Sequence, residues 1–193
     1  MPAGLRERKK LKTRLAIQEH ALRLFREQGY NGTTVEQIAE AAEVSPSTFF
    51  RYFPTKEDVI LFDALDPLLI EAFRRQPAAL SPIQALRAGI HEVWGALTPE
   101  QEEEQRERGL LAYRVPELQG ALVADLLRSA RLMAQLLAER AGRDPDDIRV
   151  RTYTGAVMGA MVAGMIPLIE DPAANLVANM DAVLDLLEGG LEL

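Results

Sequence analysis

TTVEQIAEAAEVSPSTFFRYFPTK, residues 33–56, is the stretch that decides the fold. Thr33 or Thr34 can accept a backbone hydrogen bond and so begin a first helix. The Ser45-Pro46 pair marks the start of a second helix, because serine is a favoured cap and proline is tolerated in the first turn. Phe53-Pro54 ends that helix, because the residue before a proline is pushed out of the α region. A helix, a tight turn and a short second helix are the arrangement with which helix-turn-helix proteins read DNA.

The second of these helices has two chemically different sides. At about 100° per residue, Phe49, Phe50 and Phe53 share one sector, which predicts an aromatic anchor facing the preceding helices. Ser47 and Arg51 fall on the opposite side, and Thr48 and Tyr52 lie next to them. In a major groove, arginine can bond guanine edges, and serine or threonine can contact bases or phosphates. The alternative is an ordinary amphipathic helix with a solvated polar face.

Charge is distributed unevenly along the 193 residues. The first 14 residues hold six basic side chains against Glu7 alone, a net +5, whereas the whole chain carries −7, so the remainder carries −12. A basic segment on an acidic body is the electrostatic footprint expected of a nucleic-acid-binding end. A solubilising basic tail is the alternative.

The rest of the chain predicts an all-α fold of about nine helices. Apolar residues recur at helical spacing from Leu11 to Gln28, and a further helix is predicted from Thr55 towards Arg75 with a kink at Pro67. No alternating strand pattern competes with these helices. The chain has no cysteine, which excludes disulfides and fits a reducing cytoplasm, and its start lacks the apolar segment of a secretory signal.

These residues resemble the TetR-type transcriptional repressors, continuously from about Lys10 to Val59. The resemblance implies a helix-turn-helix DNA-binding domain over residues 1–54 and a helical effector-binding and dimerisation domain over 55–193. It also implies a cytoplasmic homodimer that represses transcription on a palindromic operator and is released by a small effector. The family usually has glycine where Glu43 stands, and such turns often need a positive φ.

Several site residues follow from the resemblance. Thr34, Tyr52 and Lys56 correspond to family contacts to DNA phosphates, which set register and affinity. The recognition-helix contacts are Ser45, Ser47, Thr48 and Arg51. Arg51 is the residue we expect to read a base directly. Arg6, Arg8 and Lys9 could enter a minor groove or hold phosphates.

An effector pocket and a dimer interface are expected in the body. A pocket with apolar walls and a few polar tips suits a small hydrophobic ligand, although plain core packing would explain each residue singly. The candidate lining residues are Phe62, His91, Trp94, Tyr113, Met133 and Met158. Small residues at four-residue spacing permit close approach of another helix. The candidate interface comprises Gly155, Gly159 and Ala163, followed by an apolar stripe of Leu176, Val177, Met180, Val183, Leu184 and Leu187, which an intrachain core would also explain.

Three other interpretations are weighed against this one. The uncharged segment from Thr152 to Ile169 is long enough for a membrane, but its glycine, alanine and Pro167 favour a buried helix. An enzyme is disfavoured, because two histidines, no cysteine and no P-loop, dinucleotide turn or GxSxG elbow leave no catalytic or metal signature, and no cofactor is expected. The third is a DNA-binding regulator without a ligand, which a solid core would favour and an apolar cavity would oppose.

Overall fold

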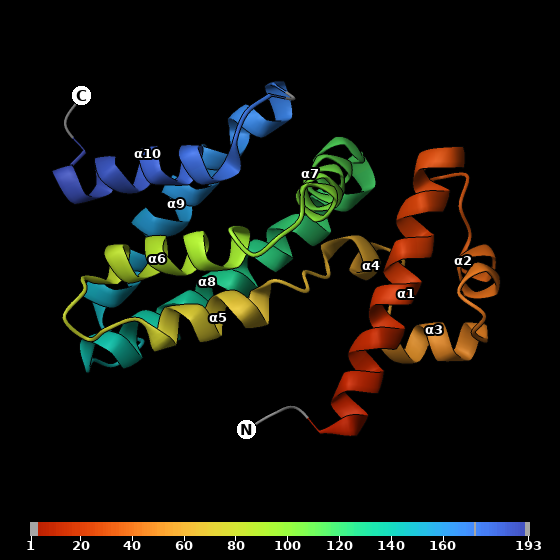
Figure 1. Cartoon of the computed structure of the whole chain (residues 1–193), viewed down its shortest axis with the longest axis horizontal. Coiled ribbons are helices and arrows are strands. Elements are labelled where there is room, and N and C mark those ends of the chain that lie inside the picture. The colour runs from red at the N-terminus through yellow and green to blue at the C-terminus, as the bar shows by residue number, and fades with distance from the viewer. Residues whose placement is uncertain (1–3, 172, 192–193) are drawn as a thin grey trace. The chain divides into compact units, whose positions relative to one another are not determined.

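The computed structural model describes residues 4–171 and 173–191, so the two expected domains include a few residues outside the described part. Helices without any strand make up the secondary structure of this part, which confirms the all-α prediction (Figure 1). The helices are α1 (Leu5–Gln28), α2 (Val35–Ala41), α3 (Pro46–Tyr52), α4 (Glu57–Leu61), α5 (Asp66–Arg75), α6 (Pro82–Trp94), α7 (Pro99–Arg114), η1 (Pro116–Leu118), α8 (Gln119–Ala141), α9 (Ile148–Glu170) and α10 (Leu176–Gly189).

The chain forms two compact units. The first comprises residues up to 64 together with 111–122, and it contains α1 to α4, the end of α7, η1 and the start of α8. Helix α2 packs between α1 and α3, and α4 packs on α1. Phe49 and Phe53 of α3 and its C-cap lie fully buried in this core, together with Leu118 from the later segment. Residues that follow the helix-turn-helix by about sixty positions thus complete part of its hydrophobic core.

The second unit comprises residues 65–110 and those from 123 onwards. Helix α6 packs between α5 and α10, and α10 also packs along α9. Its core is aliphatic and includes Leu86, Ile90, Leu137, Val157 and Leu184.

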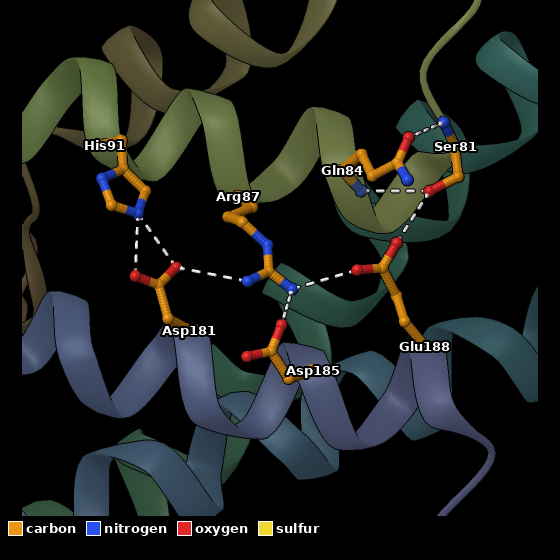
Figure 2. A network of polar contacts seen from close by, with 7 residues as sticks. All are labelled: Ser81, Gln84, Arg87, His91, Asp181, Asp185 and Glu188. Atoms are coloured by element: carbon orange, nitrogen blue, oxygen red, sulfur yellow. Dashed lines mark hydrogen bonds and ion pairs between the residues drawn. The ribbon is translucent and has the colours of Figure 1, made fainter.

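A network of ion pairs and hydrogen bonds joins α6 to α10 in this unit, as Figure 2 shows. The Arg87 guanidinium of α6 reaches Asp185 at 2.6 Å, Glu188 at 3.0 Å and Asp181 at 3.7 Å. The Asp181 carboxylate also lies 2.9 Å from Nε2 of His91. Because the three acids recur at four- and three-residue spacing, they share one face of α10 and turn that face towards α6. The network thus joins the charged side of α10 to α6.

The segment around Pro67 differs from the prediction. One kinked helix was expected from Thr55 towards Arg75, but α4 ends at Leu61 and α5 begins at Asp66. Proline has no backbone N–H and is tolerated in a first turn, so Pro67 begins a new helix instead of bending an existing one.

Candidate nucleic-acid interface

Helix α2 has the start that the sequence predicts. The Thr34 hydroxyl accepts the Gln37 backbone N–H at 3.2 Å, and the Gln37 side-chain oxygen accepts the Thr34 N–H at 2.9 Å. This reciprocal capping box satisfies two otherwise unpaired backbone donors. Thr34 is exposed at the helix N-terminus, a position that favours an anion such as a phosphate.

The turn between α2 and α3 is built around Glu43. Its φ is +53°, which confirms the predicted left-handed conformation. The Glu43 N–H bonds the Glu40 carbonyl at 3.0 Å, and the Val44 N–H bonds the Ala39 carbonyl at 2.9 Å. These two bonds form the helix-ending motif in which the residue after the cap is normally glycine. The side chain at position 43 therefore imposes backbone strain on a turn that the fold requires.

Glu43→Gly is expected to raise the free energy of unfolding by up to about 1 kcal/mol, because relief of the left-handed strain outweighs the entropy that glycine gains in the unfolded chain. It should also tighten non-specific DNA binding at low salt, because it removes an exposed negative charge beside α3. Thermal melts and salt-dependent DNA binding check both parts. A clear drop in melting temperature would contradict the strain argument.

The recognition helix α3 begins with a cluster of hydroxyl groups. Ser45 accepts the Thr48 backbone N–H at 3.1 Å, and its Oγ also lies 2.9 Å from Ser47 Oγ and 3.0 Å from Thr48 Oγ1. Ser45 and Ser47 are exposed, and Thr48 is half-buried. The predicted DNA-contacting hydroxyls therefore lie side by side on the first turn of α3.

The aromatic anchor of α3 has two members instead of three. Phe49 and Phe53 are 0% exposed, whereas Phe50 is 50% exposed. The prediction that Phe50 packs inwards is wrong, because one position along a helix turns a side chain by about 100° and the core covers only the Phe49–Phe53 side. Arg51 is exposed beside Phe50, with its guanidinium 5.4 Å from the Tyr52 ring centroid.

Arg14 holds the C-terminal end of α3, a role that its place in the basic segment did not suggest. Its Nη2 donates to the Tyr52 carbonyl at 3.1 Å. Its guanidinium stands 4.6 Å from the Phe62 ring centroid and 5.2 Å from that of Phe53. A cation near a helix C-terminus and over aromatic faces stabilises both. Arg14 thus positions the reading helix from α1.

Lys56 is tied to the protein more firmly than the resemblance implied. Its Nζ donates to the carbonyls of Tyr30 at 2.9 Å and Thr33 at 3.0 Å, and it stands 3.9 Å from the Tyr30 ring centroid. The Tyr30 hydroxyl in turn donates to the Glu57 carboxylate at 2.7 Å. Burial and this neighbouring carboxylate raise the pKa of Tyr30. Of the three Lys56 donors, two hold the α1–α2 loop, which leaves one for a phosphate.

The basic segment is part of α1. Arg6, Arg8 and Lys9 are exposed on its first turns, since α1 begins at Leu5. A helix with its side chains is about 10–12 Å across, wider than a minor groove of about 6 Å. The helix itself is therefore too wide for a minor groove, whereas entry of its single side chains into a minor groove and their contact with phosphates both stay predictions.

The six expected pocket residues are divided between the two units of the described structure. Phe62 belongs to the first unit and packs edge-on against Phe53 at 5.8 Å, and Tyr113 of the same unit is 58% exposed. In the second unit, Trp94 and Met133 pack against the aliphatic core, whereas His91 pairs with Asp181 at the surface.

Met158, the last of the six, is half-buried on α9. Two open depressions, one lined by α1 alone and one by α9 alone, contain none of the six residues.

The small residues of α9 form an exposed row. Gly155, Gly159 and Ala163 are exposed, and a Cβ added at either glycine would meet no atom within 4 Å. Larger apolar side chains flank this row, with Ile148 71% exposed and Ile166 47% exposed. By length and composition α9 could cross a membrane, and only 17% of its apolar window is buried. An apolar face that is exposed to this extent is expected to pack against another molecule.

The apolar stripe of α10, which was expected to form an intersubunit surface, lies partly in the core of its own chain. Met180 is 4% exposed and Leu184 is 0% exposed, because both pack into the core of their own chain, so their assignment to an intersubunit surface is corrected. Leu176, Val183 and Leu187 pack partly against that core, and Val177 is half-buried. Leu186, which the sequence did not single out, is 55% exposed. Within the described residues no group of three or more acidic or histidine side chains could hold a metal ion.

Comparisons with known proteins match both parts of the chain. A family described as bacterial regulatory proteins, tetR family, matches residues 17–62, and one described as the MftR C-terminal domain matches residues 80–192. The HTH-type transcriptional regulator TcmR of Streptomyces glaucescens is 40% identical over 151 residues, which cover 75% of this chain and 67% of TcmR. EthR of Mycolicibacterium smegmatis is 27% identical over 192 residues, covering 79% and 87%.

Among solved structures, the FadR repressor of Thermus thermophilus in complex with lauroyl-CoA superposes with a TM-score of 0.59 and 26% identity. The superposition covers 93% of this chain and 95% of that one.

Proposed function

Since this chain belongs to the TetR family of DNA-binding transcriptional regulators, we propose that it is a homodimeric repressor that a small hydrophobic effector releases from a palindromic operator. The observation that carries the DNA-binding part is α3. Its hydroxyl cluster and Arg51 face solvent, while Phe49 and Phe53 fix it to α1 and α2. A rigid helix with an exposed polar side is what insertion into a major groove requires.

Function divides along the chain at Pro54. Residues 1–54 contact DNA, through Thr34 and Tyr52 on phosphates and through the first turn of α3 on bases, and Lys56 adds a phosphate contact from just beyond this boundary. Residues 55–193 bind the effector and form the dimer. A role on operator DNA implies a cytoplasmic protein.

The exposed face of α9 supports the dimer. Ile148, Gly155, Gly159, Val162 and Ile166 recur at spacings of three, four and seven residues, so they share one face. A second copy that meets this face through the same face buries it around a two-fold axis. Such a dimer explains the small intrachain burial of this apolar helix better than a membrane does, because a segment rich in glycine and alanine, with Pro167, lacks the leucine, isoleucine and phenylalanine density that drives membrane insertion.

An acyl-CoA, or another amphipathic molecule with a long apolar chain, is the effector class we propose. The support is the lauroyl-CoA complex of the 26% identical Thermus protein. The apolar helices of the second unit, including the surroundings of Trp94, Met133 and Met158, would have to open for the acyl chain, and methionine side chains adapt readily to such a ligand.

Two covalent connections join the proposed effector-binding unit to the DNA-binding unit and can transmit the effect of ligand binding. One is the connection from α5 back to α4. The other is the 111–122 segment, where Leu118 is fully buried in the first core and Glu117 accepts a hydrogen bond from the Asn31 amide at 2.8 Å. Because α7 and α8 each belong to both units, an effector that shifts them would move this segment. The spacing of the two recognition helices would then no longer match the operator.

The effector proposal is tested by fluorescence anisotropy on labelled operator with lauroyl-CoA, using free coenzyme A as control. We expect lauroyl-CoA to weaken binding by about 5–150-fold, the range typical of allosteric coupling, and coenzyme A to leave it unchanged. Unchanged affinity with acyl-CoAs of several lengths would favour a second candidate, a DNA-binding regulator without a ligand. The packing of Trp94 and Met133 against a filled core supports that candidate.

Arg51 and Lys56 are expected to act differently on DNA. Arg51→Ala should cost about 1–3 kcal/mol on the operator and relax the preference at one base pair, because the side chain reads a base edge. Lys56→Ala should weaken binding to all sequences alike and lower the salt slope by about one, and it should also lower the melting temperature because the α1–α2 loop loses two hydrogen bonds. Titrations at several salt concentrations check this, and equal losses of Arg51→Ala on operator and random DNA would refute base reading.

A further inference from the structure

We propose that Phe50 reads the methyl group of a thymine in the major groove and so determines part of the operator sequence. The proposal rests on the proposed function, because it concerns the DNA that α3 contacts. It adds an apolar reader to a surface whose other members are polar or charged.

The first observation is that Phe50 is exposed where the fold does not need it. Its side chain is 50% exposed, although phenylalanine is among the residues most often buried. The anchor of α3 is already complete with Phe49 and Phe53, both 0% exposed. Ser47, three residues earlier on the helix, is exposed as well, so the ring lies next to the face expected to meet DNA.

The second observation is that the ring is held in place. Its centroid lies 5.5 Å from that of Phe49, with an interplanar angle of 86°, an edge-to-face contact with a fully buried partner. A side chain that is already ordered loses little rotamer freedom when it binds. The ring is thus an exposed apolar surface that packs on one side against a buried neighbour.

Base chemistry then selects what the ring can contact. In the major groove guanine, adenine and cytosine present hydrogen-bonding groups, whereas thymine also presents the C5 methyl group, the one apolar group on these base edges. Phenylalanine can neither donate nor accept a hydrogen bond, so placing it on the other edges would strip them of water without replacement. A thymine beneath Phe50 is the arrangement that avoids this cost.

Deoxyuridine provides the test, because it differs from thymidine only by that methyl group. Duplexes that full-length protein enriches from a random library are resynthesised with each thymine replaced singly by deoxyuridine. We expect one position in each half-site to lower the affinity of the wild-type protein about fourfold, the effect of one buried methyl group, and the other positions to be neutral. This arm needs no variant, so it stands even if a substitution harms folding.

Phe50→Ala is expected to bind the thymine and deoxyuridine duplexes equally at that position. Arg51→Ala is the matched control, since it should retain the fourfold discrimination while losing preference at a different base pair. Two results would overturn the inference: no deoxyuridine position weakens the wild-type protein, or Phe50→Ala still discriminates at the sensitive position. Failure to enrich any duplex would refute the proposed function itself.

Discussion

Replacing Phe49 with alanine is expected to lower the free energy of unfolding by about 3–5 kcal/mol and to abolish operator binding. Phe49 is 0% exposed at the junction of α3 with α1 and α2, and it contacts the rings of Phe50 and Phe53. Removing it leaves a cavity under the recognition helix in addition to the lost transfer free energy. Urea denaturation followed by circular dichroism measures the first effect, and anisotropy on operator DNA measures the second.

Phe50→Ala is the control one residue further along the helix. Half of its ring is already exposed, so its loss should cost at most about 1.5 kcal/mol, mainly the edge-to-face contact with Phe49. Equal destabilisation by the two substitutions would mean that the two rings are equally buried in solution. That result would contradict the outward-facing position of Phe50.

Gly159→Leu is expected to convert the dimer into monomers and to weaken operator binding by at least about 100-fold, because one half-site alone offers too few contacts. A Cβ at position 159 meets no described atom of its own chain within 4 Å. Leucine also favours a helix by up to about 1 kcal/mol relative to glycine, so each chain should stay folded. Sedimentation velocity with circular dichroism distinguishes folded monomers from unfolded chains.

Gly164→Leu places the same side chain five residues later with the opposite consequence. There a Cβ would lie 3.0 Å from Met180 Cε and 3.3 Å from the Asn179 carbonyl oxygen, inside the α9–α10 contact. We expect loss of stability from overpacking, about 1–3 kcal/mol or more, as the primary effect. An intact dimer for Gly159→Leu would remove α9 from the proposed interface.

Local chemistry explains why the helix-turn-helix could be predicted from sequence. The caps at Thr34 and Ser45 and the strained turn at Glu43 depend on neighbours within a few residues. Such interactions are visible in the order of residues, since the spacing alone determines which backbone groups a side chain can reach. The same holds for Pro67 only in part, because a proline signals an interruption but does not say whether it bends a helix or begins one.

Burial depth and long-range partners could not be predicted in this way. A helical wheel gives the direction of Phe50 but not how far the core extends towards it. Likewise, Met180 and Leu184 lie in an apolar stripe that intrachain and intersubunit packing would both produce. Arg14 and Lys56 carry charges that suggest DNA, yet both bond carbonyls of distant segments. The pocket set was chosen by residue type, and residue type does not specify that its members belong to different units.

Selection of binding sites from a random duplex library with the full-length protein tests the central claim most directly. We expect the enriched sequences to share an inverted repeat whose half-sites are separated by about 34–36 Å or a multiple of that spacing. The reason is that the two identical α3 helices of a homodimer must enter major grooves on one side of the duplex. An enriched single half-site without a symmetric partner would contradict the homodimer. No enrichment over random DNA would contradict sequence-specific binding by α3.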